Sequence, residues 1–189
     1  MQLPSTPIHL SRPMTSTEME RAFAGAVAIS NVQPSDVGTG LAVAGALAAP
    51  FEAWDVGKAA FGGGQAGGAL QVAGGLHTVV NGYQAVRGLF SKVTPQAISD
   101  ALKGQNGGKD LDPGDASMLA DHINGRAHLN SAIELGNAVA CGTAIATGNM
   151  AAGIVALVLK GVTTGAAFYT AAQTVKDVQT VLHGQLPPA

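Results

Sequence analysis

Two long segments of this chain, residues 59 to 86 and residues 135 to 159, contain no Asp, Glu, Lys or Arg. No sustained alternation of apolar and polar residues, the pattern of a β-strand, occurs along the chain. Prolines and Asn-Gly pairs divide it into segments of helical length and pattern. The sequence therefore predicts an all-α fold. The helices that we expect span residues 15 to 31, 35 to 49, 51 to 61, 65 to 90, 95 to 103, 113 to 124, 128 to 159 and 161 to 183.

The charged residues divide the chain into regions within one domain of residues 1 to 189. Thr94-Pro95 and Asp112-Pro113 each offer an N-cap followed by a proline at the first helical position, which predicts two helix starts in the polar centre. Lys160 separates two apolar segments, so we expect it at a hairpin turn. The fold expected is an Ala/Gly-rich helical bundle with a polar N-terminal region (1 to 36), apolar helices (37 to 90), a polar helical segment (91 to 130) and an apolar helical hairpin (131 to 183).

Alanine and glycine, rather than leucine, dominate the uncharged segments and recur at a spacing of four residues. Small residues four apart let two helix backbones approach closely, which is a main drive for helix association in lipid. Each step of four overshoots one helical turn by about 40°, so a long row needs several neighbours, as in a bundle or a ring. The rows are Gly136, Ala140, Ala144, Gly148, Ala152 and Ala156; Gly161 and Gly165; Gly45, Ala49, Ala53 and Gly57; Gly63 and Gly67; and Gly64 and Gly68.

A helix over the second uncharged segment would be roughly 37 Å long, more than the ~30 Å hydrocarbon core of a bilayer. Its side chains are only weakly apolar, which suits a member of an assembly better than a lone anchor. An alternative is a soluble helical interaction or scaffold protein with an Ala/Gly core and no membrane activity. A water-filled pore would need a polar lining, for which the candidates are Thr143, Thr147, Asn149, Thr163 and Thr164.

Composition argues against several classes of partner and compartment. The net charge is -2 and no basic run occurs, so we expect no nucleic-acid binding. Cys141 is the single cysteine, which precludes an intrachain disulfide and favours a small buried residue. Glu18 and Glu20 precede the N-terminal apolar run, where a Sec signal would carry only positive charge.

Catalytic motifs are absent from the sequence, and we expect no enzyme, no cofactor and no metal. The stretch "DLDPGD" at 110 to 115 departs from a calcium loop, because Gly114 and Asp115 stand in reversed order. Asp121, His122 and Glu134 form the one cluster that a hydrolase reading would use. A hydrolase, the third alternative, would require a polar pocket that contains ionisable groups with shifted pKa values.

With these rows over residues 37 to 90 and 131 to 183, an all-α pattern and no Sec signal, the chain resembles the small glycine-zipper pore-forming antibacterial effectors of type VI secretion. The resemblance implies a toxin that is cytoplasmic and soluble in its producer and is loaded into a secretion-tube carrier. A dedicated immunity protein would neutralise it. In the inner membrane of a target cell it would form a homo-oligomer among the lipids and dissipate ion gradients.

Overall fold

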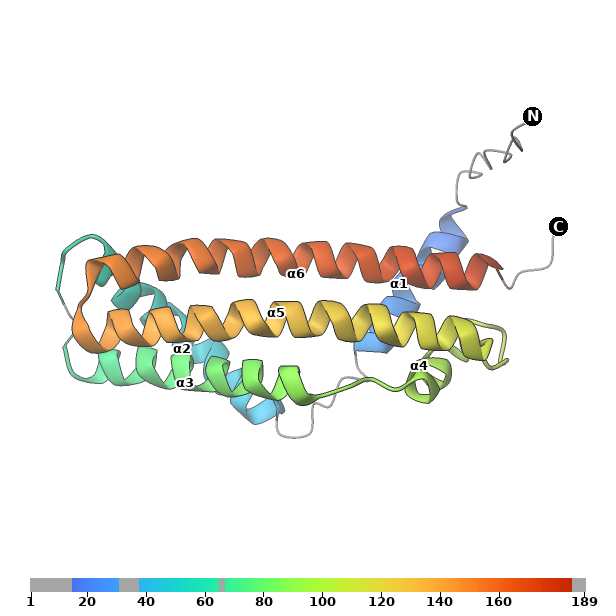
Figure 1. The fold of residues 1–189 in the computed structure, drawn as a ribbon, viewed down its shortest axis with the longest axis horizontal. Helices are drawn as coiled ribbons and strands as arrows, with labels where there is room; N and C mark the ends of the chain where they lie inside the picture. The colour runs from blue at the N-terminus through green and yellow to red at the C-terminus, as the bar shows by residue number, and fades with distance from the viewer. Residues whose placement is uncertain (1–14, 31–37, 65–66, 185–189) are drawn as a thin grey trace, which may run out of the picture.

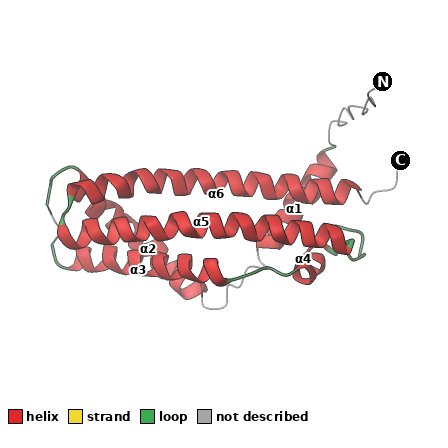
Figure 2. Ribbon diagram, in the orientation of Figure 1, coloured by secondary structure: helices red, strands yellow, loops and turns green. Residues whose placement is uncertain are grey.

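The computed structural model describes residues 15 to 30, 38 to 64 and 67 to 184. In these ranges the chain forms helices and no strand (Figure 2), which confirms the all-α prediction. The helices are α1 (Ser16–Ser30), α2 (Gly38–Ala60), α3 (Ala69–Phe90), α4 (Pro95–Leu102), α5 (Pro113–Thr147) and α6 (Met150–Gly184).

A long antiparallel hairpin of α5 and α6 organises the bundle (Figure 1). At the end that holds the hairpin turn, α3 packs along α5, and α2 contacts α3, α5 and α6. At the opposite end α1 packs on α6 and α4 packs on α5. The apolar helices and the polar central segment therefore occupy opposite ends of one elongated bundle.

The two proline-initiated helices begin where the sequence predicts. The Thr94 hydroxyl accepts a hydrogen bond from the Ala97 backbone N–H at 3.2 Å, and Pro95 opens α4. The Asp112 carboxylate accepts one from Gly114 at 2.8 Å, and Pro113 opens α5. Each side chain satisfies a helical N–H that has no partner within the helix. Asp112 thus acts as a helix cap.

Two of the predicted helix breaks are wrong. Pro50 lies inside a continuous α2, where packing of the buried Ala48 and Glu52 on either side offsets one missing backbone hydrogen bond. Asn124 lies inside a continuous α5, because its amide binds Val93 instead of its own backbone. The Asn124 Oδ1 accepts from the Val93 N–H at 2.8 Å, and Nδ2 donates to the Val93 carbonyl at 2.9 Å.

The hairpin turn also differs from the prediction, since the expected helix over 128 to 159 is interrupted. Gly148 adopts the left-handed backbone with φ 65° and ends α5, its N–H donating to the Ala144 carbonyl at 2.8 Å. Asn149 then accepts a hydrogen bond from the Ala152 N–H at 3.0 Å. Lys160, expected at the turn, lies within α6 instead.

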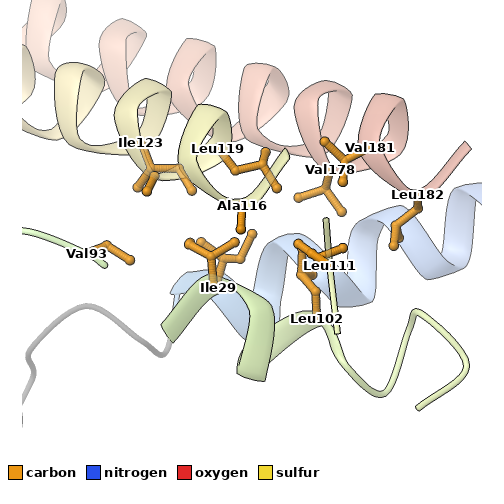
Figure 3. Close-up of a cluster of buried hydrophobic side chains, with 12 residues drawn as sticks. Ile29, Val93, Leu102, Leu111, Ala116, Leu119, Ile123, Val178, Val181 and Leu182 are labelled. Atoms are coloured by element: carbon orange, nitrogen blue, oxygen red, sulfur yellow. The ribbon is translucent and has the colours of Figure 1, made fainter. Parts of the chain in front are cut away.

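The larger hydrophobic core lies at the polar end of the bundle (Figure 3), where α1, α4, α5 and the C-terminal part of α6 meet. The smaller core, at the apolar end, consists of Val56, Cys141, Ile145 and Ala156. Many apolar side chains at this end are therefore left on the surface. The larger core consists of Ile29, Val93, Ile98, Leu102, Leu111, Ala116, Leu119, Ala120, Ile123, Val178, Val181 and Leu182.

Candidate functional site: a buried polar network behind an exposed apolar helix

The longest predicted row of small residues does not lie on one helix, because the turn at Gly148 divides it. Ala144 on α5 and Ala156 on α6 are both buried. Gly136 is exposed, and a Cβ there would only just reach the Leu159 side chain, at 4.0 Å. The row is thus folded back on itself across the hairpin, and Ala140 and Ala152 are partly buried.

The shorter rows make few close contacts in this structure. Gly161 and Gly165 are exposed on α6, with nothing within 4 Å of a Cβ placed there. In α2, Gly45 is buried near Val80, but Ala49 is partly buried, Ala53 is exposed and Gly57 faces open space.

The glycines after α2 do not form helical rows, contrary to the prediction. The described residues Gly63, Gly64, Gly67 and Gly68 lie outside helices, between α2 and α3. Gly64 and Gly68 have φ values of 76° and 55°, in the left-handed region that glycine adopts without strain. These glycines form part of the loop that connects α2 to α3.

Two other glycines make the close backbone contacts. A Cβ on Gly153 of α6 would lie 2.6 Å from the backbone nitrogen of Ala60, and one on Gly74 of α3 would lie 3.1 Å from the Cα of Glu52. Both neighbours belong to α2, so α2 touches α3 and α6 almost backbone to backbone. Gly74, Thr78 and Gly82 stand four apart, which is the sequence signal that reasoning from the longer rows missed.

The predicted pore-lining threonines bond to their own helices. The hydroxyls of Thr143 and Thr147 donate to the carbonyls four residues earlier at 2.9 and 2.6 Å. Those of Thr163 and Thr164 do the same at 2.8 and 2.9 Å, and Asn149 caps α6. Such bonds satisfy a hydroxyl without water. In this fold these residues do not converge on one channel.

A network of polar side chains lies between α2, α3 and α6, within the apolar half. Glu52 is only 1% exposed. Its Oε2 lies 2.6 Å from His77 Nδ1 and accepts a hydrogen bond from Lys160 Nζ at 2.5 Å. Its Oε1 accepts one from the Thr78 hydroxyl at 2.8 Å. One carboxylate thus joins three helices.

Electrostatics keep this carboxylate charged. Burial raises the pKa of Glu52, but the hydrogen bond and charge of Lys160, the Thr78 hydroxyl and His77 together hold that pKa below its ordinary value of 4.5. Breaking a buried ion pair by removing one partner typically costs about 3–5 kcal/mol, because the other charge stays uncompensated. Burial and the charge of Glu52 raise the pKa of the Cys141 thiol to about 12, so this cysteine stays protonated.

Asp55 is a second buried carboxyl group, 3% exposed, one turn after Glu52. Neither of its side-chain oxygens has a hydrogen-bond partner among the described residues. Burial raises the pKa of Asp55 above its ordinary value of 3.8, against the opposing charge of Lys58. Its ionised form therefore destabilises the packing of α2 on α3.

We accordingly expect Asp55→Asn to stabilise the protein at pH 7.5 by about 1 kcal/mol, or about 3 °C in Tm, because the uncompensated charge is removed. The gain disappears as the pH falls through the raised pKa, since Asp55 of the parent is then protonated and both proteins carry a neutral side chain at this position. Thermal melts between pH 3.5 and pH 7.5 measure it, with the exposed Asp121→Asn as control. A gain that persists at pH 3.5 contradicts this account.

The three residues that a hydrolase would use do not form one site. His122 Nδ1 lies 3.2 Å from Asp177 Oδ2, which also pairs with Arg126 at 2.7 Å, in a link between α5 and α6. Asp121 is exposed on α5. Glu134 lies twelve residues beyond His122, roughly 18 Å along the helix. Within the described ranges, no three His, Cys, Asp or Glu side chains are grouped to hold a metal ion.

The apolar face of α6 lies on the surface, opposite the buried network. Among the described helices α6 alone, over Met150–Leu182, is long and apolar enough to cross a membrane, and an 18-residue window within it has a mean hydropathy of 1.7. Only 11% of its most apolar 18-residue window is buried. Lys160, Gly153 and Ala156 point inward on the other side. The exposed face consists of Met150, Ala151, Ile154, Val155, Val158, Gly161, Val162, Gly165, Phe168, Tyr169 and Ala172.

A second exposed apolar row runs along α3, at alternating spacings of four and three residues. This spacing keeps the row on one side of the helix. The row consists of Val72, Leu76, Val79, Tyr83, Val86 and Phe90.

No model of a known protein family matches the chain, and no curated protein and no solved structure is significantly similar to it. Its function is inferred from its own geometry.

Proposed function

We propose that the protein permeabilises membranes: α6 enters the inner membrane of a target bacterium, copies of the chain associate, and ion gradients dissipate. The observation that carries the proposal is the exposed apolar face of α6. From Met150 to Ala172 this face is roughly 33 Å long, close to the ~30 Å thickness of a hydrocarbon core. The apolar face thus matches a membrane in length.

Because most of α6 is exposed, its apolar composition fits a membrane helix better than the core helix of a soluble protein. A core helix of the same composition would be mostly buried, whereas little of the span in α6 is covered by its own fold. Apolar surfaces of this extent mark contacts with a membrane or another protein. The row on α3 adds a second such surface, suited to lipid or to another copy of the chain.

The buried network joins the proposed membrane helix α6 to α2. Lys160 of α6 binds Glu52 of α2 on the side opposite the apolar face. An unpaired Lys near the centre of a bilayer costs about 2.5–3.5 kcal/mol on insertion scales, so Lys160 needs a partner there too. We infer that α2 accompanies α6 on insertion and that the Glu52–Lys160 pair is retained.

The same activity is implied by the resemblance to glycine-zipper effectors of type VI secretion. On that proposal the chain leaves its producer without a Sec signal, inside a secretion-tube carrier, and a small immunity protein protects the producer. The exposed face of α6 is the surface that an immunity protein would cover, because covering it blocks insertion. The alternative, a soluble scaffold protein, would use this face for a partner and ignore lipid.

Vesicles of bacterial polar lipids test the proposal. We expect the purified protein to bind them and, at nanomolar to micromolar concentrations, to release both K⁺ and an entrapped dye or, for a narrow pore, K⁺ alone. A K⁺ gradient with a potential-sensitive dye reports the second case. The protein remaining unbound after vesicle flotation, or bound without any ion release, contradicts the proposal, and an unbound protein favours the soluble scaffold.

A further inference from the structure

We propose that a groove between α1, α3, α5 and α6 binds a ligand that carries a primary ammonium group on an aliphatic body. The groove lies at the junction of the two ends of the bundle and is separate from the exposed face of α6. The proposal does not depend on membrane activity, because it stands on the shape and charge of this groove alone.

The groove has the size and surface of a small-ligand site. Its volume is about 590 Å³, within the range of ligand pockets in proteins. Apolar side chains from three helices form much of its wall, among them Phe23 and Val27 of α1, Ile123 of α5 and Val175 of α6. On the remaining side Gly88 of α3 lines the groove and packs against Ser131 of α5, whose Oγ would clash with a Cβ on Gly88. A single aliphatic chain fits such a wall.

Glu134 supplies the charge in this groove. It lines the wall, and no hydrogen bond or ion pair joins its carboxyl group to any other described residue. The neighbouring polar groups Asn130 and Thr170 bond to each other at 2.9 Å. The lining contains no Lys, Arg or His in the part of the chain that the structure describes. The carboxylate therefore lacks a counter-charge that a bound cation would supply.

The ionisation of Glu134 fits this role. Burial in the apolar groove raises the pKa of Glu134 above its ordinary value of 4.5, since no cation offsets the loss of hydration. An ammonium group near the carboxylate would form a charge-assisted hydrogen bond in partly dry surroundings. The same charge opposes anionic ligands. Polyamines carry only short methylene runs between their ammonium groups, so they would bring further charges against the apolar walls.

Binding of dodecylammonium, measured by titration calorimetry at pH 7 below its micelle concentration, tests the inference. We expect one saturable site on the full chain and binding at least about 10-fold weaker to Glu134→Gln, which keeps the shape of the side chain. Ala171→Phe, which fills the groove, should abolish binding. Val158→Asp, on the distant apolar face of α6, should leave it unchanged.

Matched ligands distinguish this site from general apolar binding. Dodecanol has the same chain without the charge, and dodecanoate has the opposite charge, so both should bind at least about 10-fold more weakly. Thermal melts establish that each variant is folded before titration. Equal affinity for the three ligands, or unchanged affinity in Glu134→Gln, overturns the proposal. So does the loss of binding in Val158→Asp, which would place the ligand on the exposed apolar face of α6 and not in the groove.

Discussion

Gly153→Ala is expected to destabilise the protein by about 3 kcal/mol, because its new Cβ would meet backbone atoms of α2 that cannot rotate away. That Cβ would lie 2.6 Å from the Ala60 nitrogen and 2.9 Å from the Ala60 Cα. α2 must then shift away from α6, which also stretches the Glu52–Lys160 contact. A thermal melt should show a Tm lowered by roughly 6–12 °C.

The matched control is Gly161→Ala in the same helix. Gly161 is exposed, and nothing lies within 4 Å of the new Cβ. Alanine is favoured over glycine in a helix by up to about 1 kcal/mol, so this variant should be as stable as the parent or more stable. If both variants lose the same amount of stability, then Gly153 is needed for a reason other than its contact with α2.

Lys160→Met is expected to cost about 3–5 kcal/mol, since it leaves the Glu52 carboxylate buried without its main counter-charge. Adding Glu52→Gln to this variant should restore part of the loss, because the uncompensated carboxylate is then removed as well. Urea unfolding of both single variants and of the double variant gives the coupling free energy. If the losses in free energy of unfolding of the two single variants add up to the loss in the double variant, then the two side chains do not interact.

Two further measurements assign the effect to this buried pair. Lys103→Met removes an exposed partner of Asp110, and a solvent-exposed pair contributes little. Stability from Glu52 is present above its ordinary pKa of 4.5 and is lost as the pH falls toward its lowered pKa in the fold. The parent should therefore lose stability below about pH 4.5 more steeply than Lys160→Met does.

Local sequence signals predicted those parts of the fold that depend on local contacts. Thr94 and Asp112 mark helix starts because a side chain two or three residues away from its target is enough to cap a helix. Pro50 and Asn124 were misread as breaks because distant packing decided the outcome in each case. The Asn124 amide binds Val93, which lies 31 residues away in sequence.

The candidate site was less accessible to sequence reasoning. Lys160 pairs with Glu52 across 108 residues of sequence, and no periodicity connects them. In α6 the predicted row includes the buried Ala156, but it contains Ala152 and misses the neighbouring Gly153, which makes the closest contact with α2. The uncharged segment 135 to 159 predicted one long apolar helix, but the turn at Gly148 divides that segment between α5 and α6. The apolar helix begins at Met150 and continues past Lys160, and only the fold shows which of its sides faces outward.

The most direct test of the proposed activity is dye and K⁺ release by Val158→Asp. Val158 is 60% exposed at the middle of the apolar face, so a carboxylate there should leave the fold intact. On insertion it would enter the bilayer at a cost of about 2.5–3.5 kcal/mol. Met118→Asp makes the same kind of change on α5, at a side chain that is 37% exposed at the polar end of the bundle.

Both variants are first compared with the parent by circular dichroism and thermal melting, and release is then measured from vesicles of bacterial polar lipids. We expect Met118→Asp to release the contents as the parent does, and Val158→Asp to need at least about a 70-fold higher concentration, the equivalent of 2.5 kcal/mol. Equal release by a folded Val158→Asp would contradict the claim that the exposed face of α6 enters the membrane.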